Sequence, residues 1–494
     1  MKRRIFPHFK TFGVVGLWLV IALMPLTLYA QKRAVPQLAY LDRSFHVYDQ
    51  IQKEIWSTPE LGFLEIKSSK ILQKHLEEKG FHVETGVAGM PTSFIATYGS
   101  GTPVIGLLAE FDALPGLSQD TVPYRKPLEK GGNGHACGHN LLGTGAVAGA
   151  VAIKEWLATT HHTGTIKVFG SPAEEGGSGK AYLARDGFFR GVDVVLDWHP
   201  TSRNFVHPNA TYTAIVNVDY IFHGKASHAG GSPHLGRSAL DGVEALNHMV
   251  NMMREHIPQA SRIHYTITHG GGAPNVVPEL AVVSYSIRHP QREVLKDLLV
   301  WVNQAAEGAA LGTQTTVDIE IISGSYEKLP NRKLAELVQR KLEAVGGVHY
   351  DERERALVGQ IVNDLGLEPT VLERAATVQP LSTEIPSTGG SSSDVGDVSW
   401  NVPTVTLGTA AFAPGSSAHS WHWVATGGTT IGTKALLNAA KVFTLTAIDF
   451  YTNPSLIDEA KQEFENRRGP DFKYEPFVGD RPPRLDYQVK KIQK

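Results

Sequence analysis

The sequence predicts an α/β domain that is interrupted at about residues 211–325 by a smaller α+β domain. Short β-branched runs alternate with helix-like patterns before residue 200, which is typical of a sheet with parallel strands. The order then changes to strand, helix, strand, strand, helix, strand, which is typical of a ferredoxin-like sandwich. Helices and a short strand return after Asn331, so the larger domain resumes there. A chain of 494 residues is long enough for both domains.

The N-terminal segment differs in character from everything that follows. Basic residues at positions 2, 3, 4 and 10 precede a nearly uncharged apolar stretch at residues 12–30. This pattern is typical of an export signal, so we expect residues 1–30 to be a signal peptide and the protein to be periplasmic or secreted. The stretch is also long enough for an uncleaved membrane anchor, which is the alternative.

The first part of the larger domain, residues 31–210, contains a helix-like pattern and then alternating strands and helices. Helical periodicity occupies residues 43–80, and a second helix is expected at about 141–159. Strands are expected at residues 93–98, 103–111, 164–170 and 192–199. These elements predict the α/β sheet.

The inserted segment and the remainder of the chain follow in order. Within 211–325, strands are expected at residues 211–222, 261–268, 279–289 and 316–322, and helices at 239–256 and 292–311. The second part of the larger domain, residues 326–455, contains a short strand at 404–407 and a helix at 431–451. Residues 456–494 form a C-terminal extension, which we expect to be an extended surface segment from Pro470 onward.

Charge and cysteine content exclude several classes of function. The net charge of −2 comes without any block of like charges, so nucleic acid is a poor candidate as a partner. The lone cysteine, Cys137, excludes an intrachain disulfide framework and leaves one thiol to explain.

The segment Gly134-His-Ala-Cys-Gly-His-Asn140 is the sharpest local signal. Cys137 and His139 are two residues apart, a spacing that suits a turn converging on one point rather than a helix face. A thiolate and an imidazole are ligands that zinc prefers. His135 is a weaker candidate ligand, and the alternative is a glycine-rich turn whose histidines bind nothing.

A pair of adjacent carboxylates, Glu174 and Glu175, follows the strand at residues 164–170. Neighbouring side chains diverge in an extended chain, so the two glutamates are suited to different tasks. Metal-assisted hydrolysis needs both a carboxylate ligand and a free carboxylate as general base. A solvated acidic turn is the alternative.

Further candidate ligands follow or flank other predicted strands, and they are Glu110, Asp112, His199, His419 and His422. Because ligand sites in open α/β sheets lie at the carboxyl ends of strands, we expect these segments to meet in one crevice. This convergence, more than any single motif, predicts a metal site.

With these motifs in view, the chain resembles the amidohydrolase branch of the aminoacylase and carboxypeptidase G superfamily of metallopeptidases. It is most similar to the p-aminobenzoyl-glutamate hydrolase and auxin-conjugate hydrolase members. The motifs are residues 109–115 (AEFDALP), 134–140 (GHACGHN), 171–177 (SPAEEGG), 197–200 (DWHP), 224–230 (GKASHAG), 275–278 (NVVP) and 393–400 (SDVGDVSW). The resemblance implies a two-metal aminopeptidase-like catalytic domain whose inserted domain acts as a lid and in dimerisation. It also implies hydrolysis of the amide bond of N-acyl amino acids or small dipeptides.

The resemblance also implies roles for individual residues. Two divalent ions, zinc or manganese, are expected on Cys137, His139, Glu175, His199 and His419, with Cys137 as a candidate bridge. Glu174 matches the general base, and His228 matches a histidine that stabilises the oxyanion, often across a homodimer. Asn275 and Arg288 match substrate-binding positions. The secondary candidates are Glu110 and Asp112 near the ions, and His422 as the alternative to His419.

Two other functions remain open at this point. One is a catalytically silent binding protein of the same fold, against which the complete set of ligands and the base argue. The other is a serine hydrolase using Ser392 or Ser393, which the absence of a G-x-S-x-G elbow weakens. Trp198, Trp421 and Trp423 lie beside proposed ligands, so an aromatic acyl group is one candidate, although such residues are more often core.

Overall fold

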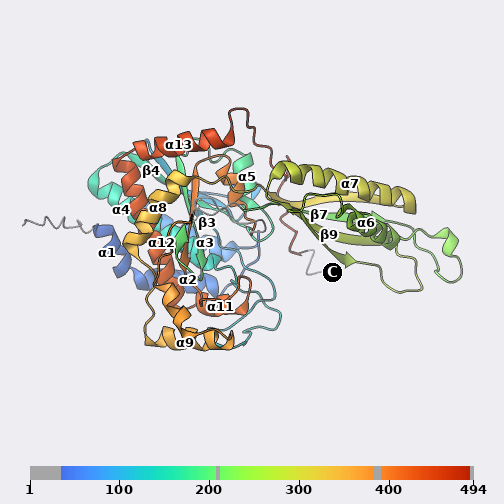
Figure 1. Cartoon of the computed structure of the whole chain (residues 1–494), viewed down its shortest axis with the longest axis horizontal. Coiled ribbons are helices and arrows are strands. Elements are labelled where there is room, and N and C mark those ends of the chain that lie inside the picture. The colour runs from blue at the N-terminus through green and yellow to red at the C-terminus, as the bar shows by residue number, and fades with distance from the viewer. Residues whose placement is uncertain (1–34, 207–211, 383–390, 490–494) are drawn as a thin grey trace, which may run out of the picture. The chain divides into compact units, whose positions relative to one another are not determined.

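The computed structural model describes residues 35–206, 212–382 and 391–489, so the export signal or anchor expected at residues 1–30 lies outside the described residues. Strands in these residues form two sheets (Figure 1). The first has seven strands in the order β1-β2-β4-β3-β5-β11-β6, and the second has four in the order β10-β7-β9-β8. The predicted α/β class with a second, separate sheet is confirmed.

The seven-stranded sheet is mixed. Its strands are β1 (His82–Thr85), β2 (Phe94–Ser100), β3 (Val104–Ala109), β4 (Gly164–Gly170), β5 (Val194–Thr201), β6 (Phe205–Val206) and β11 (Thr404–Ala410). Strands β4, β3, β5 and β11 run parallel in the centre, as predicted. The expectation of a parallel sheet is wrong for β2, which runs antiparallel to β4. Residues 101–103 alone separate β2 from β3, whereas a parallel crossover needs a dozen or more residues.

Helices surround this sheet. They are α1 (Pro36–Arg43), α2 (Phe45–Trp56), α3 (Ile66–Glu78), α4 (His139–Thr160), α5 (Gly179–Arg185), α8 (Arg332–Val345), α9 (Glu352–Asp364), α10 (Val395–Ser399), α11 (Trp421–Gly427), α12 (Thr430–Thr452) and α13 (Ser455–Arg468). Helix α4 is apolar on nearly all sides and is long and apolar enough to cross a membrane, but it is buried in the core. It packs on α12, where Gly149 lies against Phe443. The ligand candidate His139 is therefore the first residue of a core helix.

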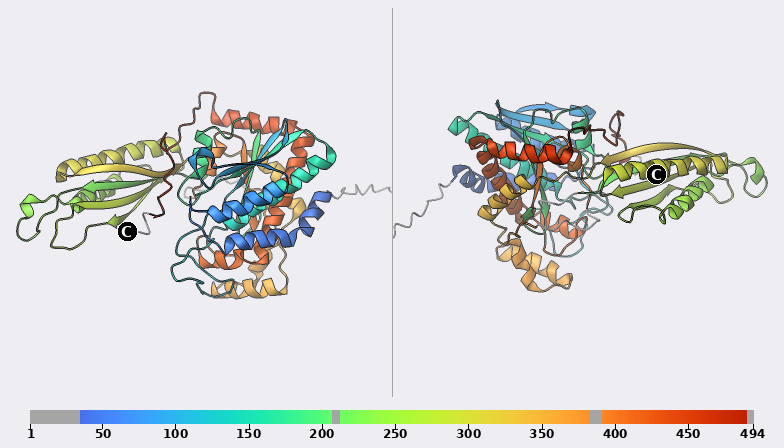
Figure 2. Two further views of the ribbon diagram at one scale, coloured as in Figure 1. Left: turned by 180° about the vertical axis from the view of Figure 1, so that it is seen from behind. Right: turned by 45° about the horizontal axis from the view of Figure 1, so that its top comes forward.

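The second sheet consists of β7 (Ala214–His223), β8 (Arg262–His269), β9 (Leu280–His289) and β10 (Thr316–Ser325). All neighbouring strands are antiparallel. Helices α6 (Ala239–Met253) and α7 (Arg292–Thr313) pack together on one face of this sheet (Figures 1 and 2). The burial of β7 alternates between inward and outward positions, which is why it reads as a half-exposed strand in the sequence. The element order is the one that the sequence predicts.

The C-terminal extension differs in part from the prediction. From Pro470 to Gln488 the chain forms no named helix or strand, as expected, but it is not purely a surface segment. Tyr474, Phe477 and Tyr487 are buried, and the Tyr474 hydroxyl donates to Oδ1 of Asp397 at 2.7 Å. These aromatic side chains attach the extension to both parts of the fold because their burial removes a large apolar area from water.

Candidate metal centre

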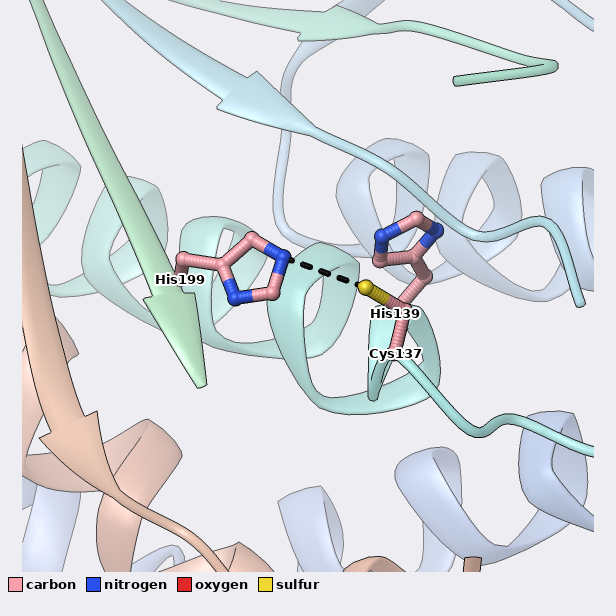
Figure 3. A group of neighbouring side chains, drawn as sticks. All are labelled: Cys137, His139 and His199. Atoms are coloured by element: carbon pink, nitrogen blue, oxygen red, sulfur yellow. Dashed lines mark hydrogen bonds between the residues drawn. The ribbon is translucent and has the colours of Figure 1, made fainter. Parts of the chain in front are cut away.

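A tight turn before α4 brings Cys137 and His139 together. Between them, Gly138 adopts φ +79°, in the left-handed region that favours glycine. A Cβ at this position would lie 2.6 Å from Cζ of Phe412 and 2.8 Å from Cγ of Pro200, so no larger residue fits. Figure 3 shows His199, at the end of β5, facing this turn, with its Nε2 3.4 Å from Sγ of Cys137.

Carboxylate and carbonyl groups behind the cluster orient its histidines. Nδ1 of His139 lies 2.8 Å from Oδ1 of Asp112, and Nδ1 of His199 lies 2.8 Å from the carbonyl oxygen of Pro200. Each ring is thereby held so that Nε2 faces the cluster, the arrangement that metal-binding histidines usually show. The other oxygen of Asp112 accepts the backbone N–H of Glu175 at 2.9 Å. Asp112 therefore supports two candidate ligands rather than acting as one.

The two adjacent glutamates lie in a strained turn after β4. Ala173 and Ser178 on either side have φ values of 58° and 57°, which non-glycine residues rarely adopt outside functional sites. Oε1 of Glu175 lies 3.4 Å from Nε2 of His419, which itself has φ 56°. Glu174 instead lies near Glu110 and His139, so the two neighbouring carboxylates diverge as the sequence predicts.

Three sets of potential ligand atoms lie within 4.8 Å of one another. The sets are Cys137 with His139 and His199, Cys137 with Glu175 and His419, and Glu110 with His139 and Glu174. The five ligands expected from the sequence account for the first two sets, and Cys137 belongs to both. The third set joins the expected general base to Glu110.

The chemistry of these atoms fits divalent cations. Nε2 of His139, Oε1 of Glu175 and Oε2 of Glu110 are buried and have no hydrogen-bond partner. Such groups cost free energy unless something satisfies them, and their convergence points to a positive ion. Thiolate, imidazole and carboxylate groups together are a donor set that zinc accepts.

The electrostatics of the cluster lead to the same conclusion. Burial, reinforced by Glu175, raises the pKa of the Cys137 thiol well above its ordinary value. Burial, followed by the charges of Glu110 and Glu175, likewise raises the pKa of Glu174. Both shifts reflect an excess of acidic groups without a compensating cation, and a bound ion would oppose them.

A buried lysine that no sequence pattern singles out stands behind the cluster. Nζ of Lys180 lies 2.6 Å from Oε1 of Glu110 and 2.6 Å from Oδ1 of Asp394. Burial alone would raise the pKa of Glu110, but Lys180, His139 and His199 together lower it. Lys180 thus keeps Glu110 in its ionised form next to His139. Asp394 lies in one of the sequence motifs, whereas nothing in the sequence separates Lys180 from an exposed lysine.

A cavity of about 690 Å³ opens in front of the cluster. Cys137, Glu174, Glu175, His199 and His419 line it, while His139 lies behind them and is fully buried. Of the substrate-binding candidates, Arg288 lines the cavity and Asn275 does not.

His228 also lies outside the cavity lining. It is exposed and sits beside Asn275, whose carbonyl oxygen accepts the N–H of Ala229 at 3.0 Å. Nδ1 of His228 accepts the backbone N–H groups of Gly230 and Gly231 at 3.1 and 3.0 Å. A neutral ring held in this way carries its proton on Nε2, which points a donor away from the loop. Neither His228 nor Asn275 reaches the cavity of its own chain.

The remaining candidates lie at the margin of the site. Nε2 of His135 lies 3.2 Å from the carbonyl oxygen of Ile55, and Nδ1 of His422 lies 3.2 Å from Oγ of Ser420. Neither belongs to a set of potential ligands, so the geometry favours His419 over His422. Trp423 lines the cavity, whereas Trp198 is a core residue whose indole donates to the carbonyl oxygen of Leu142.

The serine alternative finds no support in the same region. Oγ of Ser392 lies 3.0 Å from Oγ1 of Thr213 and accepts from Arg288 at 3.4 Å. Oγ of Ser393 accepts the backbone N–H of Val395. Within the described part of the chain, neither hydroxyl is paired with a histidine that would activate it as a nucleophile.

Comparison with known proteins agrees with this geometry. The sequence profile of peptidase family M20/M25/M40 matches residues 106–422. One of the polypeptides of the p-aminobenzoyl-glutamate hydrolase of Escherichia coli (strain K12) is 38% identical over 444 residues, which are 85% of this chain and 92% of the relative. The Xaa-Arg dipeptidase of Homo sapiens is 28% identical and covers 86% of this chain and 90% of its own length.

Among solved structures, an aminobenzoyl-glutamate utilization protein from Klebsiella pneumoniae superposes with a TM-score of 0.56. It is 17% identical and covers 81% of this chain and 97% of its own, so it supports the fold. The resemblance that the sequence motifs suggest is confirmed.

Proposed function

The chain belongs to peptidase family M20/M25/M40, and on this premise we propose that it hydrolyses the amide bond of N-acyl amino acids or small dipeptides by means of two divalent cations. Metal-dependent amide hydrolysis is the activity of this family. The observation that carries the proposal is the pair of ligand sets that share Cys137 beside the uncoordinated carboxylate of Glu174. A catalytically silent relative would have no reason to keep both.

Zinc or manganese is our proposal for the ions. Cys137, His139 and His199 would hold one, and Cys137, Glu175 and His419 the other. A sulfur ligand favours zinc, whereas the carboxylates and imidazoles suit either metal.

Bound ions would supply positive charge that polarises the amide carbonyl and acidifies water. The protein's own groups then carry the protons. Glu174 lines the cavity beside the ligand sets, so its carboxylate can take a proton from the attacking water and deliver it to the leaving amine. Nε2 of His228 is a suitable donor to the developing oxyanion if a second copy of the chain brings it into the cavity.

The cavity supports a substrate of modest size with an acyl group and a free carboxylate. The Arg288 guanidinium on its wall forms a planar fork that matches a carboxylate. Trp423 contributes an aromatic face on which an aryl group can pack. The relative of 38% identity is named for p-aminobenzoyl-glutamate, an amide that joins an aromatic acid to an amino acid.

We propose a homodimer that forms through the inserted domain. Helices α6 and α7 expose Met249, Met252, Trp301 and Leu311, which are 36 to 83% accessible. An exposed apolar patch of this kind is typical of a protein interface. Strand β8 is an edge strand of its sheet, so a second chain could pair with it. A dimer would also explain why His228 and Asn275 lie away from their own cavity, and analytical ultracentrifugation tests for it.

Export remains a proposal that rests on the sequence alone. The basic start and the apolar stretch at residues 12–30 support a cleaved signal, with a membrane anchor as the alternative. Mass spectrometry of the mature N-terminus after expression with a cellular export system distinguishes the two.

The proposed activity is tested with the purified protein and a panel of N-acyl amino acids and dipeptides. Release of the free amino acid should stop after dialysis against EDTA and return when zinc or manganese is added. Ser392→Ala should keep the activity within a few-fold, because in this mechanism its hydroxyl is no nucleophile. Activity that survives complete metal removal would contradict the proposal, as would the absence of turnover with every substrate at full metal loading.

A further inference from the structure

A buried lysine with no carboxylate partner lines the cavity. Lys328 follows β10, and only 8% of its surface is exposed. Its Nζ donates to Oγ1 of Thr406, and it forms no salt bridge with any described residue. An ammonium group has three protons to donate, and buried charges are normally paired. Lys180, by comparison, is buried between two carboxylates.

The acid nearest to Lys328 is separated from it by a hydroxyl group. Oγ1 of Thr406, which accepts from Lys328, donates to Oδ2 of Asp197 at 2.7 Å. Burial lowers the pKa of Lys328 to about 8, and Asp197 opposes the shift only in part. Burial, reinforced by Glu110, raises the pKa of Asp197 itself to about 7. A ligand with a second negative charge would therefore favour the charged form of the lysine.

A second cation without a carboxylate partner shares the cavity wall. Arg288 on β9 donates to Oγ of Ser392 at 3.4 Å, and no described carboxylate pairs with it. Its fork can bind a carboxylate through two parallel hydrogen bonds, whereas Lys328 offers a point charge.

The acidic groups of the lining are already engaged. Glu174 and Glu175 belong to the ligand sets, and Asp394 is paired with Lys180. Among the lining residues that the structure describes, no acid remains to pair with a basic side chain of a substrate. Away from the ligand sets the cavity is thus positive on balance.

We propose that Lys328 binds the side-chain carboxylate of the amino acid half of the substrate, so that the enzyme acts on N-acyl derivatives of dicarboxylic amino acids such as glutamate and aspartate. This inference rests on the proposed amidohydrolase function and specifies its substrate class. Arg288 takes the α-carboxylate, which its fork matches, and Lys328 takes the second carboxylate. Substrates with arginine or lysine in this position are disfavoured, because two like charges would meet in a partly desolvated cavity.

A purely structural role for Lys328 makes a different prediction. If the lysine served only to neutralise Asp197 through Thr406, its replacement would impair the hydrolysis of every substrate to the same degree. A specificity role requires that the loss depend on the charge of the substrate side chain.

The test compares N-benzoyl-L-glutamate with N-benzoyl-L-glutamine, two substrates that differ in one charge and hardly in shape. The metal-loaded wild-type protein should prefer the glutamate compound by at least about 10-fold in kcat/KM, the scale of one charged contact. Lys328→Met should reduce this preference by about 10-fold or more, and Lys328→Arg should retain part of it. Lys333→Met is the matched control, since this lysine on α8 is exposed and pairs with Glu459 at 3.2 Å. It should leave the preference as it is.

Direct binding provides a second measurement. Calorimetric titration of the metal-loaded protein with L-glutamate and with L-glutamine should show the same ratio of Kd values and the same loss in Lys328→Met. If circular dichroism shows that this variant does not fold, Lys328→Arg and the wild-type substrate ratio decide the question.

The failure of this inference can be told from failure of the proposed function. Equal rates with both benzoyl compounds, or a Lys328→Met variant that loses both equally, would overturn the role of Lys328 while leaving the amidohydrolase intact. Absence of turnover with all substrates would contradict the proposed function, and the glutamate titration would then still show whether Lys328 binds the second carboxylate.

Discussion

Asp112 fixes the ring of His139 through a 2.8 Å contact between Oδ1 and Nδ1. Its second oxygen holds the backbone of Glu175, so one carboxylate supports a ligand in each of the two ligand sets. Removal of such an outer-shell partner typically costs about 10- to 100-fold in metal affinity. We expect Asp112→Asn to weaken metal binding by this factor, as measured by competition with a chromogenic chelator. Asp120→Asn, which changes an acid paired with Lys126 instead, is the control. Unchanged affinity in Asp112→Asn would mean that the ligands need no such support.

Glu174→Gln separates general-base catalysis from metal binding. Because the amide cannot accept a proton, kcat should fall by about 10²- to 10⁴-fold while the metal content per chain stays the same. Stopped assays and elemental analysis of the same preparation give both numbers. A variant that also loses metal would assign Glu174 to the third ligand set, with Glu110 and His139, and not to proton transfer.

Cys137→Ala should lower the occupancy of both ions, since the thiol belongs to both sets. Elemental analysis after gel filtration should find clearly less metal per chain than in the wild type. Ser392→Ala is a suitable control, because it changes another hydrogen-bonding residue of the cavity wall without touching a ligand. Full occupancy in Cys137→Ala would exclude the sulfur as a ligand.

His75 on α3 provides a pH-dependent contribution to stability away from the metal centre. Burial lowers its pKa from 6.5 to about 4, and its ring packs edge-on against Tyr48 at 5.6 Å. The unfolded chain therefore binds one more proton than the folded chain between these two pH values. The contribution of His75 is fully present above pH 6.5 and is lost as the pH falls toward 4, by about 3 kcal/mol at most.

We expect His75→Phe to flatten the fall in the free energy of unfolding between pH 7 and pH 4.5, as measured by urea denaturation. His46→Phe, an exposed position on α2, is the control and should keep the wild-type slope. Parallel pH profiles of wild type and His75→Phe would show that the buried ring does not resist protonation.

Much of the fold could be predicted because its strands carry strong local signals. Strand β4 has the bounds expected from the sequence, and the strands of the second sheet begin and end within a few residues of the predicted positions. The convergence of the ligands followed from one rule, since β3, β4, β5 and β11 are parallel and their carboxyl ends meet at one edge.

The parts that could not be predicted depend on contacts between distant segments. Lys180 lies on α5, a seven-residue helix too short to show periodicity, and its partner Asp394 is 214 residues away in sequence. Lys328 is equally silent in the sequence, because burial and the lack of an acidic neighbour are properties of the folded chain. The antiparallel direction of β2 depends on pairing with a strand that follows it by more than sixty residues.

Helix α4 is both the central helix of the core and the element whose first residue is a candidate ligand. Motion of His139 away from the cluster therefore requires disruption of the packing between α4 and α12 rather than fraying of a surface loop. Amide protons in the first turns of α4 should accordingly exchange with solvent as slowly as those of the most protected strands, even in protein stripped of metal. The cage for the ions is then a standing feature of the polypeptide, and their departure leaves it open but largely in place.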